Sequence, residues 1–133
     1  MKKLILFFLI SFSSHAIVYK PSDYSTKGSF CEKSDSDFKE FRHKENIPVC
    51  DRNVSDKLKK KVFFDYGIPE NEQATYTIDH RIPLFLGGSN HQDNLWPQSR
   101  LIYTGNLEMV IFGLLKKGII NQKEGLSLIM AVK

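Results

Sequence analysis

The feature that most limits the fold of this 133-residue chain is a pair of β-favouring segments separated by a loop rich in glycine. The first segment, 76–78, reads Tyr-Thr-Ile, and the second, 94–97, reads Asn-Leu-Trp-Pro. Gly87 and Gly88 lie in the loop, where a chain that reverses its direction needs backbone angles that other residues resist. The pattern predicts a strand, a turn-rich loop and a returning extended segment.

Three helices are expected around this unit. Ser55 can cap a first helix that Gly67 ends. A second is expected from about Leu107, where apolar residues form one stripe and lysines occupy the last turn. Asn121 and Glu124 form a capping pair that opens a third. The order of helix, strand, loop, strand, helix and helix predicts a small α+β domain.

The first residues predict the compartment. Two lysines lead an apolar run, 4–10, and Ser-His-Ala at 14–16 places small residues at both key positions of a cleavage site. The run is too short for a membrane-spanning helix, which needs about 20 apolar residues. We therefore expect a cleaved signal peptide over 1–16 and export, either to the periplasm or out of the cell, without a membrane anchor.

The next segment, 17–53, is polar and broken by proline, glycine and serine. We expect an irregular arm here, with a short helix around Asp37–Arg42, followed by one compact domain over 54–133. Cys31 and Cys50 are the only cysteines. An even count in an exported chain favours a disulfide over a metal site, so the two should pin the arm.

Charge alone does not predict nucleic-acid binding. The formal net charge is +4, and loss of the two leader lysines would lower it to +2. A local basic face remains open, and the candidates for phosphate contacts are Arg81, Arg100, Lys116 and Lys117. Lysine-rich helix faces are more often simply solvated.

The densest pattern with chemical meaning is Asp-His, Ile-Pro, Gly-Gly-Ser-Asn and Asn-Leu-Trp-Pro, in this order between 79 and 97. It resembles the HNH nuclease family, in which a strand ending in Asp-His or His-His precedes a proline, a Gly-Gly loop, Asn-Leu and a helix bearing a metal ligand. The resemblance covers roughly 48–129. It implies a small ββα metal-binding core with flanking helices, which hydrolyses phosphodiester bonds of DNA, and in second place RNA, with one histidine and one divalent cation.

The resemblance also implies roles for single residues. Asp79 would hold the metal, while His80, neutral near pH 7, would accept the proton of the attacking water. Asn94 matches the middle letter of the family motif, and its amide would tie the loop to the backbone and keep the histidine oriented.

The third letter departs from the family pattern. A histidine or asparagine is expected about nine residues after the middle asparagine, and Tyr103 stands there instead. Asn106 is the favoured second ligand and Glu108 its rival, although an asparagine at a helix start is also an ordinary cap. Carboxylate and amide oxygens favour Mg²⁺, with Mn²⁺ as the second choice.

Two other functions stay open at this point. The chain can be a nucleic-acid-binding protein of HNH ancestry that has lost turnover, as Tyr103 suggests. It can also be a disulfide-stapled interaction protein whose arm docks a partner. In each case one compact domain is expected to act as a monomer.

Overall fold

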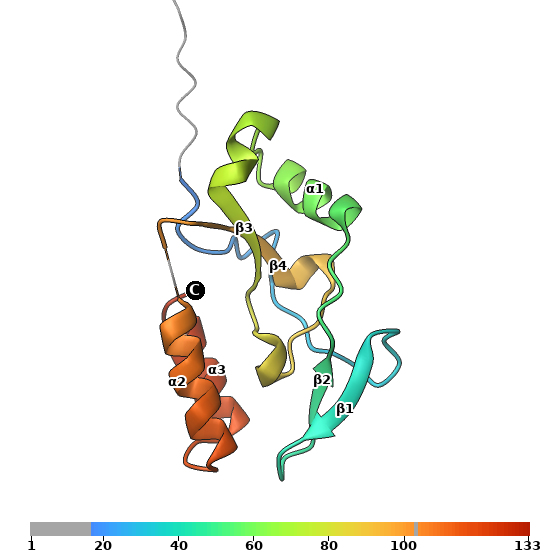
Figure 1. Cartoon of the computed structure of the whole chain (residues 1–133), viewed down its shortest axis with the longest axis vertical. Helices are drawn as coiled ribbons and strands as arrows, with labels where there is room; N and C mark the ends of the chain where they lie inside the picture. The colour runs from blue at the N-terminus through green and yellow to red at the C-terminus, as the bar shows by residue number, and fades with distance from the viewer. Residues whose placement is uncertain (1–16, 103) are drawn as a thin grey trace, which may run out of the picture.

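The structure, a computed structural model, describes residues 17–102 and 104–133, so the leader expected over 1–16 lies outside the described residues. Two small antiparallel sheets and several helices make up this part of the chain, which confirms the predicted α+β class (Figure 1). The strands are β1 (Phe38–Arg42), β2 (Ile47–Cys50), β3 (Tyr76–His80) and β4 (Leu95–Ser99), and the α-helices are α1 (Asp56–Asp65), α2 (Gly105–Lys116) and α3 (Gln122–Met130). Within the described ranges, none of these helices combines the length and apolar character that crossing a bilayer requires.

The two predicted β-segments pair as the antiparallel hairpin of β3 and β4, with His80 opposite Leu95. The connecting loop turns at Gly87, whose φ of 89° lies in the left-handed region that glycine adopts without strain. Gly88 is needed for a different reason, because a Cβ there would lie 1.8 Å from the carbonyl oxygen of Ile82. The two glycines let the loop fold tightly against the end of β3.

The expected ends of α1 and the expected start of α3 are confirmed, whereas α2 begins at Gly105, two residues before the expected Leu107, and its N-cap is Thr104. Ser55 accepts a hydrogen bond from the backbone N–H of Leu58 and caps α1, and Gly67 follows the helix with a φ of 65°. Asn121 and Glu124 form a reciprocal capping box at the start of α3. These ends are fixed by contacts between residues only three or four positions apart, which explains why the sequence predicts them.

The arm is more regular than expected. The short helix predicted around Asp37–Arg42 is wrong, since β1 pairs there with β2 in an antiparallel hairpin. His43 and Asn46 take left-handed angles in its turn. Ile47 is 1% exposed and packs under α2 and α3, so long-range burial decides the conformation.

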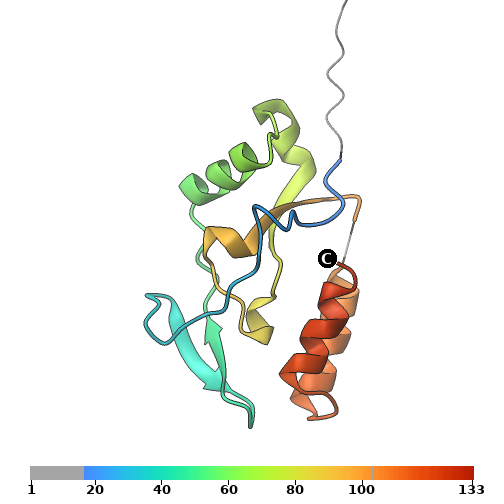
Figure 2. The ribbon, with the colours of Figure 1, turned by 180° about the vertical axis from the view of Figure 1, so that it is seen from behind.

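The remainder of the arm lies along the loop between β3 and β4, as the view from behind shows (Figure 2). Backbone hydrogen bonds join Gly28 to Asp93 and Ser29 to Ser89. Thr26 is buried and donates its hydroxyl to the carbonyl oxygen of Leu95. The arm therefore belongs to the structure that supports this loop.

The core divides into two clusters. One lies where α2 and α3 meet the loop and the hairpin of β1 and β2, and consists of Ile47, Ile82, Leu86, Ile111, Leu115 and Ile129. The other lies between α1 and the sheet of β3 and β4, and consists of Val62, Phe63, Ile68, Tyr76, Ile78 and Leu95. Ile78 and Ile82 belong to different clusters, so the three residues between them are held firmly from both sides.

The predicted disulfide is present. Cys31 and Cys50 are bonded, with their Cα atoms 5.9 Å apart, and both are buried. The bond links the arm to the end of β2, 19 residues further along the chain. It therefore fixes the backbone that continues into Asp51 and Arg52.

Loss of this bond should destabilise the domain. We expect the double variant Cys31→Ser, Cys50→Ser to lose about 3 kcal/mol of unfolding free energy, because the unfolded chain regains the entropy of a closed loop of this length. Urea denaturation measures the difference. Dithiothreitol should lower the unfolding midpoint of the wild type and leave that of the variant unchanged, and equal midpoints for the two untreated proteins would contradict the expectation.

Candidate active site

Asp79 and His80 end β3, and both line a cavity of about 350 Å³. Glu108 enters the same cavity from the first turn of α2, and Arg42 and Arg52 line it from β1 and from the segment after β2. Three regions of the chain, 42–52, 79–80 and 108, thus bring acidic, basic and imidazole groups to one place. Such a mixture in one cavity marks a candidate active site.

Two carboxylates in this cavity share one cationic partner. The Nζ atom of Lys133 lies 2.6 Å from Oδ2 of Asp79 and 2.6 Å from Oε1 of Glu108. It also donates to the backbone carbonyl oxygen of His80, at 2.8 Å. The Lys133 side chain is 0% exposed. Three oxygen atoms therefore converge on a single buried positive charge.

The same oxygen atoms suit a divalent cation. Carboxylate and carbonyl oxygens are the ligands that Mg²⁺ and Mn²⁺ prefer, and two carboxylates balance a charge of two. Asp79 and Glu108 are the residues that would hold such an ion. The donor set therefore fits the magnesium or manganese centre expected from the sequence.

The second carboxylate belongs to Glu108, which the sequence offered only as the alternative to Asn106. Asn106 is exposed and does not line the cavity, whereas Glu108 does. The physical reason is helical geometry. Asn106 and Glu108 are two positions apart in the sequence, so their side chains lie about 200° apart around the helix axis and point to nearly opposite sides. Tyr103, at the position of the third motif letter, lies outside the described residues.

His80 is buried and hydrogen-bonded on both ring nitrogens. It is 3% exposed, with Nε2 3.0 Å from Oδ1 of Asn90 and Nδ1 3.3 Å from a guanidinium nitrogen of Arg52. Burial lowers the pKa of His80 below its ordinary value, and the nearby Arg52 charge lowers this pKa further. The hydrogen bond to Asn90 acts in the opposite direction. The balance keeps the imidazole neutral near pH 7.

Asn90 defines which ring nitrogen of His80 carries the proton. Its amide nitrogen donates to Oδ2 of Asp37, at 2.6 Å, and to the carbonyl oxygen of Asp51, at 2.8 Å. The amide oxygen therefore faces His80 and accepts from the Nε2–H group. The guanidinium group of Arg52 can only donate hydrogen bonds. Its contact with Nδ1 therefore also requires that Nδ1 carries no proton and that Nε2 carries it. Nδ1 is left as the basic nitrogen.

Replacing Asn90 should weaken the preference for a proton on Nε2 of His80. In Asn90→Leu, which has a similar volume, Nε2 loses its acceptor and Arg52 alone still favours the Nε2–H form, so we expect the other neutral ring form to appear beside it. Imidazole ¹⁵N chemical shifts distinguish the forms directly. Asn106→Leu, on the surface of α2, is a matched control and should leave the spectrum of His80 unchanged. A single ring form in Asn90→Leu would contradict the expectation.

Asn94 does not line the cavity and ties the loop together. Its Oδ1 accepts from the backbone N–H of Ile82, and its Nδ2 donates to the carbonyl oxygens of Ile82 and Ser89. The side chain is fully buried. The structure thus contains the tie that the resemblance implied, adjacent to the backbone that follows His80.

The basic residues selected from the sequence do not gather at this cavity. Arg81 turns toward the arm, where it contacts Asp23 and the carbonyl oxygen of Thr26, and Arg100 donates to the carbonyl oxygen of Ala74. Lys116 and Lys117 lie at the far end of α2, about 12 Å along the axis from Glu108. Within the described residues, the arginines of the cavity are instead Arg42 and Arg52.

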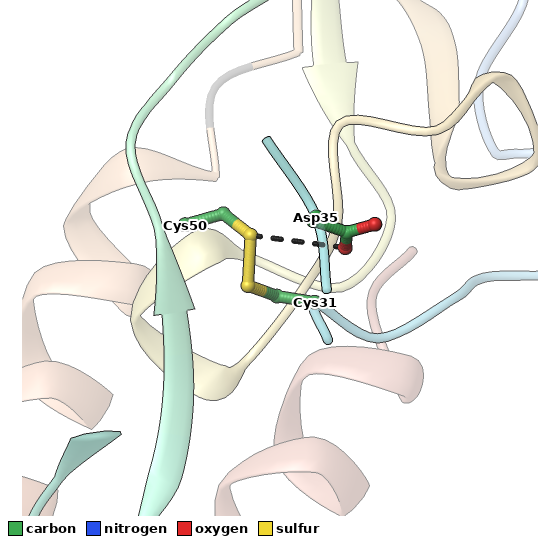
Figure 3. Close-up of side chains that lie close together, drawn as sticks. All are labelled: Cys31, Asp35 and Cys50. Carbon is green, nitrogen blue, oxygen red and sulfur yellow. Dashed lines mark hydrogen bonds between the residues drawn. A yellow bond between two sulfur atoms is a disulfide. The ribbon is translucent and has the colours of Figure 1, made fainter. Parts of the chain in front are cut away.

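A second group of potential ligands is not available to a metal in this form of the protein. Cys31, Asp35 and Cys50 lie together, with Sγ of Cys50 3.9 Å from Oδ2 of Asp35 (Figure 3). Both sulfur atoms are in the disulfide, so neither is a thiolate that can bind a metal. They also carry no proton, so the contact with Asp35 is not a conventional hydrogen bond.

Comparisons with protein-family models, with curated proteins and with solved structures find no match for this chain. The functional assignment therefore depends on the residues of the cavity and on their geometry.

Proposed function

We propose that this chain is a metal-dependent endonuclease that hydrolyses phosphodiester bonds of DNA, with RNA as a second substrate. One observation supports this most strongly. The carboxylates of Asp79 and Glu108 meet at one cation position, and the buried, neutral His80 lies in the same cavity. A hard-cation site beside a basic imidazole is what water-mediated cleavage of a phosphodiester needs.

His80 would act as the general base. Its Nδ1 nitrogen is unprotonated and lies against Arg52, which also lines the cavity. Once the Arg52 guanidinium turns from Nδ1 to the substrate phosphate, a water molecule at this nitrogen would transfer its proton to the ring as it attacks phosphorus. The 3′ oxygen would leave and take a proton from water, giving a 5′ phosphate and a 3′ hydroxyl. Asn90 would hold the ring in place while the proton moves.

Asp79 and Glu108 would bind the divalent ion. When bound, Mg²⁺ supplies positive charge for the phosphate oxygens and for the departing oxygen. The two carboxylates come from a strand and from a helix that are each packed into the core, so their separation is maintained by the fold. Rigid support of this kind preserves the geometry that catalysis requires.

Arg52 and Arg42 would bind the substrate phosphate. Arg52 is positioned by a 2.7 Å hydrogen bond from its guanidinium to the carbonyl oxygen of Ile78. Arginine pairs well with phosphate because its planar group offers several donors at once. The positive charges also offset the carboxylates, which would otherwise repel a nucleic acid.

The pH dependence of cleavage should report the environment of His80. Because the pKa of His80 is lowered, the ring stays neutral to more acidic pH, and kcat/KM should fall only below about pH 6.5, the ordinary value for histidine. Arg52→Met removes a charge that lowers this pKa, so the acidic limb should move to higher pH. Arg42→Met, which lines the cavity without contacting His80, should leave its midpoint in place. A midpoint that is the same in Arg52→Met and in the wild type would contradict this role.

The compartment is also part of the proposal. The disulfide is compatible with an oxidising environment, and a leader over 1–16 would direct the chain there. Export would place the enzyme where it meets extracellular or periplasmic nucleic acid and not the nucleic acid of the cell that makes it.

Plasmid cleavage tests the proposed activity. Purified chain 17–133 should convert supercoiled plasmid to nicked and linear forms with Mg²⁺, stop when chelator is added, and resume when Mg²⁺ is restored in excess. The same assay on single-stranded RNA tests the second substrate. Cleavage that continues in chelator would contradict the proposal. Salt-sensitive DNA binding without cleavage in any divalent metal would instead indicate a protein that has lost turnover.

A further inference from the structure

Lys133 is a buried charged group for which the proposed reaction has no use. We infer that Lys133 acts as an internal cation, which holds Asp79 and Glu108 together in the metal-free protein and leaves when a divalent ion binds. This inference depends on the proposed metal centre, and it adds a competition that governs how readily the centre fills.

Lys133 has no capacity left to bind substrate in its present position. An ammonium group has three N–H donors, and three acceptors surround it: Asp79, Glu108 and the carbonyl oxygen of His80. With the side chain 0% exposed, no donor remains for a phosphate oxygen. The residue therefore occupies the site without contributing to the chemistry.

A metal ion and Lys133 cannot occupy the site together. The Nζ atom lies 2.6 Å from an oxygen of each carboxylate, and an ion bound to the same oxygens at about 2.1 Å would overlap it. The exchange is favoured by charge. Two carboxylates and one ammonium carry a formal charge of −1, whereas two carboxylates and a divalent ion are neutral, and the carboxylates are mostly shielded from water, at 22% and 24% exposed.

The segment that carries Lys133 can move without disturbing the core. Helix α3 is anchored by Ile129, which is fully buried, and ends at Met130. Ala131 and Val132 are exposed, and Lys133 is connected to the helix by a backbone hydrogen bond to Ile129. Release therefore requires that the backbone after α3 opens and that the side chain swings away from the two carboxylates.

Two consequences follow for the metal-free protein. Lys133 neutralises the carboxylate pair in part, so repulsion between the two negative charges does not strain the fold. Metal binding is weaker than the ligands alone would allow, because each ion must first displace Lys133. Removal of the ammonium should reverse both effects, lowering the thermal stability of the metal-free form and strengthening metal binding.

The variant Lys133→Met removes the charge and keeps a chain of similar length. We expect it to bind Mn²⁺ about tenfold more tightly or better than the wild type in calorimetric titration, a coupling of ordinary size for two sites. Its melting temperature without metal should be lower, and Mn²⁺ should raise it by more than in the wild type. Lys123→Met, on the exposed face of α3, is the matched control and should behave as the wild type in both measurements.

Chemical labelling of lysines observes the displacement itself. Brief acylation of the wild-type protein, read by peptide mass spectrometry, should leave Lys133 protected without metal and modified when Mn²⁺ is present. Lys123 should react equally in both conditions. If neither the wild type nor Lys133→Met binds Mn²⁺, the metal centre and the inference both fail. If both bind it with equal affinity and Lys133 stays protected, the inference alone is wrong.

Discussion

Replacing His80 with alanine should lower the rate of plasmid cleavage by about a hundredfold to ten thousandfold, the usual contribution of a general base. His80 offers a basic nitrogen in the cavity, and no other imidazole lines it among the described residues. Initial rates at saturating Mg²⁺ measure the loss. Affinity for Mn²⁺ should remain within a few-fold of the wild type, because the ring is not a ligand.

The choice of alanine has a structural risk, because His80 is buried and bonded to Asn90. His80→Gln is a second variant that retains a hydrogen-bonding side chain of comparable size but cannot act as a base near pH 7. It should be as inactive as alanine while it unfolds at a temperature close to that of the wild type. Substantial cleavage by a folded His80→Gln protein would show that another group accepts the proton.

The variants Asp79→Asn and Glu108→Gln should each weaken Mn²⁺ binding by more than about a hundredfold and abolish cleavage. Loss of a direct ligand exceeds the 10- to 100-fold cost typical of groups that only support ligands. Calorimetric titration gives the affinity. Both changes replace one oxygen by nitrogen and preserve the shape of the side chain, so the fold should survive.

Asn106→Ala is the informative control for these variants. Asn106 was the favoured second ligand from sequence, yet it is exposed and outside the cavity. Metal affinity and cleavage should therefore be unchanged in Asn106→Ala. The reverse pattern, with Glu108→Gln active and Asn106→Ala inactive, would require the first turn of α2 to rearrange when the ion binds.

Elements of the fold that depend on neighbouring residues could be predicted from the sequence. The cap at Ser55, the capping box of Asn121 with Glu124 and the turn at Gly87 each act over a few residues. The strand β1 could not be predicted in this way. Its conformation depends on pairing with β2 and on the burial of Ile47 against helices far along the chain, which no local preference records.

In the candidate site, too, only the features that depend on neighbouring residues could be predicted from the sequence. Asp79 and His80 are adjacent and belong to a dense motif, so they could be selected from the sequence. The partners of His80 could not. Asn90 is separated from it by 10 residues and Arg52 by 28, and Lys133 lies 54 residues from Asp79. A local pattern contains no signal for contacts made only by folding.

To decide whether Glu108 or Asn106 is the second metal ligand, one must know which side of α2 faces the cavity. Both residues lie in the first turn of α2, and both carry oxygen atoms that bind Mg²⁺. The sequence places them two positions apart, but it does not say which side of the helix meets β3. Packing of Ile111 and Leu115 into the core decides this, and it turns Glu108 toward Asp79.

Diffraction from crystals soaked in Mn²⁺, recorded where manganese scatters anomalously, tests the metal centre most directly. One anomalous peak should lie between the carboxylates of Asp79 and Glu108, in the place that the Lys133 ammonium holds in the metal-free protein. A saturated crystal with no peak at these carboxylates, or with a peak whose ligands do not include Asp79, would contradict the proposed centre.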